Sequence, residues 1–432
     1  MNTEKKYVYL FGSSRTEGAA DMKNLLGGKG ANLAEMCRLG ITVPSGFTIS
    51  TEACTAFTMQ GREHVTALIQ AQVLRGIAFT EQEMGKTFGN AADPLLLSVR
   101  SGARASMPGM MDTILNLGLN DEAVEGLARK TNNERFAWDS YRRFIQMYGD
   151  VVMGLKPLSK EEHDPFEIII EMLKEARGVK LDTELNANDL KELVQRFKSL
   201  IRARIGRDFP TDPWEQLWGA IWAVFESWNN DRAKVYRELN DIPQSWGTAV
   251  NVQTMVFGNL GDHSATGVAF SRDAGTGEDL FNGEFLVNAQ GEDVVAGIRT
   301  PQQVSLVGSR RWAELAMVSE ADRARDFPSL QELMPAIFDQ LLHFETTLEN
   351  HFRDMQDIEF TIQEGKLWML QTRNGKRTGA AMVRIAMEML KQGMIDERTA
   401  LQRVSPDRLN ELLHPIFDPK ALLAATAVAR GL

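Results

Sequence analysis

The sequence is poor in the features that mark secreted or membrane-spanning chains. Its 432 residues include 2 cysteines, Cys37 and Cys54, which cannot form a disulfide framework and fit a reducing compartment. No stretch approaches the roughly 18 uninterrupted apolar residues of a membrane span. The apolar run Tyr7–Phe11 is too short for the core of a secretory signal. These absences predict a cytoplasmic protein that has no membrane partner.

Excess positive charge is absent as well. Lys and Arg number 48 against 58 Asp and Glu, which gives a net charge of -10 and disfavours a nucleic acid as the default partner. The 6 histidines have no partners at metal-ligand spacing. No Ser-His-Asp or Cys-His arrangement suggests a protein nucleophile. The usual hydrolase and soft-metal chemistries are therefore disfavoured.

What the chain does contain is typical of a large soluble protein. Apolar residues make up 43% and charged residues 25%, and at about 150 residues per domain the length predicts roughly three compact units. The hydrophobic period changes along the chain and delimits four segments. Residues 1–120 are mixed strand and helix, 121–245 helix, 246–377 strands with a helical stretch around 329–352 and a hairpin, and 378–432 helix. A tryptophan-rich stripe at Trp214–Trp228 keeps helical spacing and is interpreted as a core face.

The most informative segment is a predicted β-hairpin. Strands at 357–363 and 367–373 are separated by the loop 364–366. A three-residue loop segregates polar side chains to one face and apolar ones to the other, whereas a two-residue loop would set Glu359 opposite Leu370 and mix both faces. We therefore expect the three-residue loop.

The polar face of this hairpin carries a possible ligand set. Asp357 and Glu359 lie two residues apart and so point the same way, and hard oxygen ligands suit Mg²⁺. Gln371 and Arg373 are predicted beside them, where they can hold the phosphate oxygens that the metal also bridges. On the hairpin alone, a solvated sheet face with cross-strand ion pairs is an equal alternative.

Three further motifs suggest anion binding without requiring it. The stretch Gly27–Gly30 carries Lys29 at the start of a predicted helix. It is either a cradle for an anion or an ordinary glycine turn. Arg100 is predicted at the end of a buried strand, and Arg104 follows in a loop of small residues. The two arginines either bind phosphate through their guanidinium groups or form a pair on the surface. Glu292 lies in a glycine turn after a predicted strand. It is either a ligand of a metal or a ribose, or an acidic residue of the turn without such a role.

Several of these motifs resemble a known family. The segments that carry the resemblance are 25–36, 98–116, 141–148, 288–297, 354–362 and 370–377. Together they look like the nucleotide-binding part of the pyruvate, phosphate dikinase family, over essentially the whole chain. The string Ser98–Asn116 is the most specific of them. The related water-using dikinase, phosphoenolpyruvate synthase, shares only shorter versions.

The resemblance implies an α/β (α+β) fold of the ATP-grasp type, with ATP held between two lobes. The first lobe would be 1–120 and the second 246–377, with a helical insertion at 121–245 and a helical linker at 378–432. The implied nucleotide- and phosphate-binding residues are Lys29, Arg100, Glu292, Asp357, Glu359, Gln371 and Arg373. Asp357 and Glu359 would hold Mg²⁺, and the implied catalytic residues are Arg100, Glu359 and Arg373.

The implied reaction cleaves ATP with inorganic phosphate, releases AMP and pyrophosphate, and leaves a phosphoryl group on a histidine of a swivelling domain. Neither that histidine motif nor the family's pyruvate-binding barrel is found in this sequence, so we expect the N-terminal portion of such an enzyme, which as a whole can form a homodimer. A module of the water-using dikinase and a non-catalytic ATP-binding module are the alternatives. One local departure is Arg272–Ala274, where the family commonly has a proline before Thr-Gly-Glu.

Overall fold

The structure, a computed structural model, describes residues 5–105, 107, 109–159, 163–296, 299–413, 421 and 425–426. It confirms a mixed α/β chain. Its contacts separate two compact units. Unit 1 comprises Met1–Gly267, Phe285–Gln302 and Ile358–Arg373, and unit 2 comprises Val268–Glu284, Gln303–Asp357 and Asn374–Leu432.

A five-stranded antiparallel sheet organises unit 1. Its strands, in spatial order, are β1 (Val8–Phe11), β2 (Gly46–Ile49), β5 (Thr248–Thr254), β3 (Leu97–Ala103) and β4 (Thr113–Leu117). β5 falls in the segment that the sequence assigned to a second lobe, yet it is the central strand here. All its residues are buried, because it is hydrogen-bonded to β2 on one side and β3 on the other.

Two helices of unit 1 bend at glycines. α1 (Lys23–Arg38) begins earlier than the expected helix at 31–39, but it is interrupted at Gly27, whose φ is 67°. Its predicted end is confirmed, since Gly40 has φ 74° and its N–H bonds to the Cys37 carbonyl. α2 (Thr51–Met84) bends at Gly61 in the same way.

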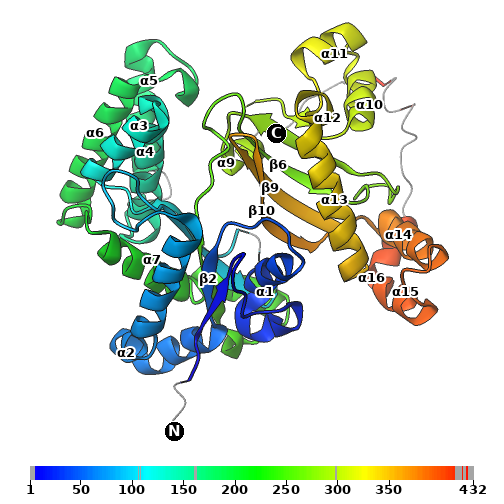
Figure 1. Ribbon diagram of the computed structural model, residues 1–432, viewed down its shortest axis with the longest axis horizontal. Helices are drawn as coiled ribbons and strands as arrows, with labels where there is room; N and C mark the ends of the chain where they lie inside the picture. Colours follow the sequence, from blue (N-terminus) through cyan, green and yellow to red (C-terminus); the bar gives the residue numbers. More distant parts are fainter. Residues whose placement is uncertain are drawn as a thin grey trace. The chain divides into compact units, whose positions relative to one another are not determined.

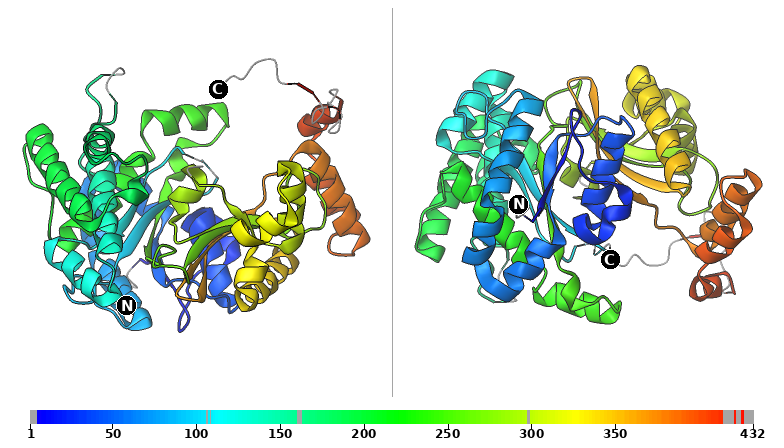
Figure 2. Two further views of the ribbon diagram at one scale, coloured as in Figure 1. Left: turned by 90° about the horizontal axis from the view of Figure 1, so that it is seen from above. Right: turned by 60° about the horizontal axis from the view of Figure 1, so that its bottom comes forward.

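The predicted helical segment is confirmed. It forms α3 (Asp121–Thr131), α4 (Glu134–Val151), α5 (Pro165–Arg177), α6 (Ala187–Ile205), α7 (Pro213–Ser227) and α8 (Asp231–Leu239), and α3–α6 lie side by side (Figures 1 and 2). Asn or Asp caps the start of each of these helices with a side-chain hydrogen bond. The aromatic stripe is core, as predicted: Trp222 and Trp228 are buried, and Trp218 stacks on Trp222 at 5.4 Å.

A second five-stranded sheet contains the hairpin. Its spatial order is β10 (Lys366–Asn374), β9 (Gln356–Gln363), β6 (Ala265–Phe270), β7 (Asn282–Val287) and β8 (Gln302–Gln303). The expected three-residue loop is wrong: only Glu364 and Gly365 separate the strands, with φ values of 48° and 75°. Two consecutive positive φ values are typical of a tight hairpin turn. The three-residue loop would have put Trp368 and Leu370 on the apolar face of the hairpin. Near the turn, however, Leu367 and Met369 are the buried residues.

Helices fill most of unit 2. They are α10 (Leu306–Ala316), α11 (Glu320–Asp326), α12 (Leu330–Leu333), α13 (Pro335–Phe352), α14 (Gly379–Lys391), α15 (Glu397–Arg403) and α16 (Pro406–Leu409). Figure 1 shows α12 near one end of α13 and α14–α16 near the other. α14 and α15 bury Ile385, Met389 and Ala400 in a core that they share with Met355. The helical prediction for 378–432 is confirmed as far as Leu413, and most of the residues after Leu413, including His414, lie outside the described ones.

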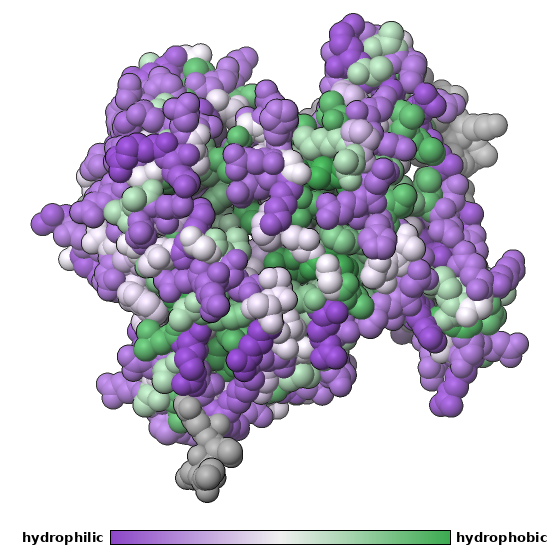
Figure 3. Space-filling view, viewed as in Figure 1, coloured by the Kyte–Doolittle hydropathy of each residue, from purple (hydrophilic) through white to green (hydrophobic). Residues whose placement is uncertain are grey.

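Hydrophilic residues dominate the face of the molecule seen in Figure 3, with hydrophobic residues in smaller patches between them. In the part of the chain that the structure describes, no helix is both long enough and apolar enough to cross a membrane.

Candidate functional site

Glycines bring Lys29 to the end of β3. A Cβ atom on Gly27 would lie 1.8 Å from the carbonyl oxygen of Gly102, and one on Gly30 would lie 2.7 Å from the side chains of Thr48 and Asn251. Any larger residue would therefore force α1 away from the sheet. The glycine motif is explained by this close packing, which sets Lys29 in the first turn after the break in α1.

Arg100 and Glu359 meet although 259 positions separate them in the sequence. The Arg100 Nη2 atom lies 3.4 Å from Glu359 Oε2, with exposed side-chain fractions of 18% and 28%. Gln371 Nε2 donates a hydrogen bond of 3.1 Å to the other oxygen, Oε1. Both carboxylate oxygens are thus oriented, and β3, β9 and β10 each contribute one side chain.

The charges of this cluster are unbalanced. Burial, together with the neighbouring Arg100 and Arg373, lowers the pKa of Lys29 to about 7, against the opposing pull of Glu359. Burial acts to raise the pKa of Glu359, but Arg100, Lys29 and Arg373 outweigh it and hold that pKa below its ordinary value. Lys29, Arg100 and Arg373 all act on the Glu359 carboxylate, and we call these four residues the cation cluster. Positive side chains gathered in this way can attract an anion.

Asn32 is a site-forming residue that the sequence reasoning missed. Its Nδ2 donates a 2.7 Å hydrogen bond to the carbonyl oxygen of Thr372, the residue before Arg373. Asn32 is buried, and this bond ties α1 to β10. It lies one residue beyond the Gly-Lys-Gly-Ala stretch, so its position on the helix that carries Lys29 was the available signal.

Asp357 stands at the second position of β9, two residues before Glu359, and is 6% exposed. Its contacts group it with unit 2. Within the described ranges no group of three or more His, Cys, Asp or Glu side chains is arranged to hold a metal ion. Mg²⁺ in proteins is often bound through only one or two carboxylates and completed by phosphate oxygens and water.

Glu292 lies in α9 (Gly291–Ala296), and its side chain is outside what the structure describes. Its neighbour Asp293 is held firmly. Asp293 Oδ1 lies 3.2 Å from Arg143 Nη2, and its Oδ2 accepts the Gln290 N–H at 2.8 Å. Arg143 also pairs with Asp139. Arg143 therefore fastens α9 to α4, a role that no sequence signal gave.

Arg104 does not join Arg100 as a second fork. Its guanidinium lies 5.4 Å from the ring centroid of Trp246, as in a cation–π contact. It starts the loop of small residues in which Ser106 and Pro108 lie outside the described residues. Asn230 Nδ2 fixes that loop from α8 by donating to the Met110 carbonyl oxygen at 3.1 Å.

Comparison with known proteins agrees with this arrangement. Residues 23–394 match the family described as pyruvate phosphate dikinase, AMP/ATP-binding domain. The chain is 54% identical over 428 residues to pyruvate, phosphate dikinase of Clostridium symbiosum and 54% identical over 416 residues to that of Rhizobium meliloti (strain 1021). It is 50% identical over 431 residues to the chloroplastic pyruvate, phosphate dikinase of Mesembryanthemum crystallinum.

These alignments cover 99%, 96% and 100% of this chain but 45%, 44% and 42% of the three relatives. The chain thus spans less than half the length of the curated relatives that it matches. With a family match over most of its length and a cluster of cations built from the same motifs, this chain belongs to the family of pyruvate, phosphate dikinase AMP/ATP-binding domains.

Proposed function

We propose that this chain binds Mg-ATP and takes part in phosphoryl transfer, within an ATP-grasp fold. The observation that carries the proposal is the cation cluster, in which Lys29, Arg100 and Arg373 act on the Glu359 carboxylate. Such an excess of positive charge at the end of a glycine-packed helix suits the phosphates of a nucleotide. The family match to an AMP/ATP-binding domain supports the same ligand.

Each side chain of the cluster has a distinct task in this proposal. Arg100 and Arg373 offer planar forks that hold phosphate oxygens in fixed directions, and Lys29 adds a point charge. Glu359, held by Arg100 and Gln371, keeps Arg100 in one orientation before the nucleotide arrives. The site therefore supplies position and charge, which is what phosphoryl transfer requires of a protein.

Asp357 and Glu359 are the residues that would hold Mg²⁺. Their carboxylates are hard oxygen donors on one strand, and the low pKa of Glu359 keeps its carboxylate ionised at neutral pH. Bound there, the ion would neutralise charge that develops on the phosphates. We also propose Glu292 as a nucleotide-side ligand, which the resemblance of segment 288–297 to the family implies.

The relatives are pyruvate, phosphate dikinases, a name that points to pyruvate and phosphate as co-substrates. We propose that this chain performs the nucleotide part of that chemistry. ATP and inorganic phosphate yield AMP and pyrophosphate, and one phosphoryl group passes to a histidine on a swivelling domain of the complete enzyme. The barrel that binds pyruvate belongs to the same complete enzyme.

Calorimetric titration with Mg-ATP tests the proposal. Replacing Lys29 with Met should weaken binding by about tenfold or more, because hydrogen bonds to charged groups are worth about 1.5–3 kcal/mol. Lys23 begins the same helix and is exposed, so Lys23→Met is the matched control and should bind as the parent does. Equal affinity of the two variants would overturn the assignment of the site.

Dependence on inorganic phosphate separates the proposed reaction from that of a water-using dikinase. AMP formation from labelled ATP by the complete enzyme should require phosphate, and the isolated chain should not become stably labelled. AMP formation at full rate without phosphate would favour the water-using reaction.

A further inference from the structure

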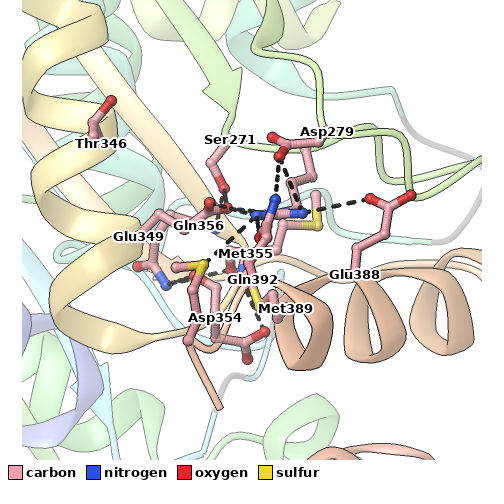
Figure 4. Close-up of polar contacts among 12 residues, drawn as sticks. Ser271, Asp279, Thr346, Glu349, Asp354, Met355, Gln356, Glu388, Met389 and Gln392 are labelled. Atoms are coloured by element: carbon pink, nitrogen blue, oxygen red, sulfur yellow. Dashed lines mark hydrogen bonds and ion pairs between the residues drawn. The ribbon is translucent and has the colours of Figure 1, made fainter.

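Arg272 is the centre of a polar network in unit 2. Figure 4 shows residues of this network, among them Ser271, Glu349 and Gln392. Arg272 is 1% exposed. Its Nε and Nη2 atoms donate to the two oxygens of Glu349 on α13, each at 2.9 Å. Nη2 also donates to Gln392 Oε1 at 2.9 Å, directly after α14. One guanidinium therefore joins the end of β6 to two helices.

Further charged groups complete the network. Arg272 Nη1 lies 3.5 Å from Asp279 Oδ2 and 3.6 Å from Glu388 Oε2. Gln392 Nε2 donates to the same Asp279 oxygen at 2.8 Å. Because Glu388 is in the last turn of α14, the carboxyl end of that helix is held by contacts with Arg272 and Asp279.

The turn after Arg272 holds the other end of α14. Thr378, the N-cap residue, donates its N–H to the Ala274 carbonyl oxygen at 3.0 Å and its hydroxyl to the Gly275 carbonyl oxygen at 2.7 Å. Gly277 has φ 75°, and a Cβ atom there would lie 2.8 Å from the carbonyl oxygen of Ala381. α14 is thus fixed at both ends by the segment 271–279, and the predicted linker helix is an integral part of unit 2.

A short chain of contacts leads from this network to the start of β9. Ser271 Oγ donates to Glu349 Oε1 at 2.6 Å and accepts the Gln356 N–H at 3.0 Å. The Ser271 N–H donates in turn to the Gln356 carbonyl oxygen at 3.0 Å. Gln356 is 1% exposed and directly precedes Asp357. Both backbone groups of Gln356 are therefore set by Ser271, whose hydroxyl is set by Glu349.

Asp354 anchors the same strand start from the other side. Its Oδ1 accepts from Arg377 Nη1 at 2.8 Å and from the Met355 N–H at 2.9 Å, and it lies 3.6 Å from Arg403 Nη1 on α15. The segment 354–357 is consequently held by side chains from the region of α14 and α15 as well as from α13.

We propose that Arg272 is a positioning residue: through Glu349 and Ser271 it fixes the backbone that carries Asp357, and it couples that backbone to the seating of α14. The functional part of this inference rests on the proposed role of Asp357 as a ligand of Mg²⁺. Arg272 does not touch the nucleotide or the metal. It determines whether the Asp357 carboxylate is presented in a fixed direction.

Two substitutions cut this path at different points. Ser271→Ala removes one hydroxyl that bridges Glu349 and Gln356 and leaves Arg272 with its partners. Arg272→Lys keeps the charge and one ion pair but cannot reach Glu349, Gln392 and Asp279 together. Arg311→Met is the matched control, because Arg311 pairs with Glu278 of the same turn but is 51% exposed.

Hydrogen exchange followed by mass spectrometry tests the coupling without nucleotide. Arg272→Lys should speed exchange about tenfold or more both in α14 and in the peptide 354–357, because hydrogen bonds to charged groups are worth about 1.5–3 kcal/mol. Ser271→Ala should speed exchange in 354–357 alone, and Arg311→Met in neither. If Arg272→Lys affects α14 while 354–357 exchanges as in the parent, the proposed coupling is wrong. If Arg272→Lys does not fold, Ser271→Ala decides by the same readout, and parent-like exchange of 354–357 overturns the proposal.

A magnesium titration separates positioning from general loosening. In both Ser271→Ala and Arg272→Lys, the Mg²⁺ concentration that half-saturates ATP binding should rise severalfold, while the affinity for metal-free ATP stays that of the parent. Equal losses with and without Mg²⁺ would contradict a role in presenting Asp357. If the parent binds no ATP, the proposed function fails, yet the exchange experiment still decides the coupling.

Discussion

Replacing Glu359 with Gln separates two proposed properties of the cation cluster, the binding of Mg²⁺ and the attraction of the phosphates of ATP. The amide keeps the size of the side chain and removes its charge. Folding should survive, because Ile358, Phe360 and Ile362 of the same strand are fully buried and remain unchanged. The substitution alters the charge balance, since the Glu359 carboxylate, which interacts with Lys29, Arg100 and Arg373, is lost.

The expected magnitudes follow from the contacts of Glu359. The substitution removes a proposed Mg²⁺ ligand and the ion pair of 3.4 Å between Glu359 and Arg100. Loss of a group that stabilises charge in the transition state typically costs about 2.7–4 kcal/mol, or about 10²–10³ in turnover of the complete enzyme. Mg²⁺-dependent binding of ATP should weaken about tenfold or more, equivalent to about 1.4 kcal/mol. Metal-free ATP should bind at least as well as to the parent, because an excess of positive charge attracts the phosphates more strongly.

Calorimetry with ATP in Mg²⁺ and in a chelator measures both quantities on one protein. The reasoning predicts that the ratio of the two affinities collapses in Glu359→Gln. A parallel loss in both conditions would show that Glu359 supports the fold of the site and not the metal. An unchanged ratio would remove Glu359 from the metal site altogether.

Three other outcomes are expected. The pKa of about 7 at Lys29 means that its charge is lost as pH rises through that value, so ATP affinity should fall between about pH 6 and pH 8.5 in the parent, and the fall should disappear in Lys29→Arg, whose charge persists; a pH profile of ATP binding measures this. Arg100→Lys and Arg373→Lys keep the charge but lose the fork, so each should weaken ATP binding in calorimetry, and parent-like binding would show that charge suffices. Burial beside Glu349 raises the pKa of Glu345 from 4.5 to about 7, so the stability gained from its bound proton is complete below about pH 4.5 and is lost as pH rises through about 7. The free energy of unfolding should therefore fall by about 3 kcal/mol between low and high pH. Urea unfolding at both pH values should show this fall in the parent and not in Glu345→Gln.

Local patterns in the sequence sufficed to predict most elements but not their partners. The helices α3–α8 and the strand character of β5 follow from hydrophobic period and capping residues. Nothing in the period of β5 shows that it pairs with β2 and β3, because strand pairing is decided by contacts far apart in the chain. The prediction of the hairpin turn was wrong because of the backbone conformation of one residue. Glu364 adopts a positive φ, a conformation that is uncommon for residues other than glycine and asparagine and is therefore not expected from the sequence.

Local sequence patterns suggested the residues of the candidate site, but not which of them would lie close together. Arg100 and Glu359 lie on strands that no local pattern associates, and their meeting at 3.4 Å is a property of the fold. The glycines around Lys29 were interpreted as a turn or an anion cradle, whereas the structure requires them for close packing of α1 on the sheet. Arg272 was visible only as part of a departure from a family pattern, because its partners come from three separate elements.

The central claim is that the cation cluster holds the phosphates of ATP. Its most direct test compares the affinities of ATP and adenosine for the parent chain and for Arg100→Met, by calorimetry in Mg²⁺. The account predicts that the variant loses about tenfold or more of its affinity for ATP and keeps the parent's affinity for adenosine, which has no phosphate. Equal affinity of parent and variant for ATP, or an equal loss for both ligands, would contradict it.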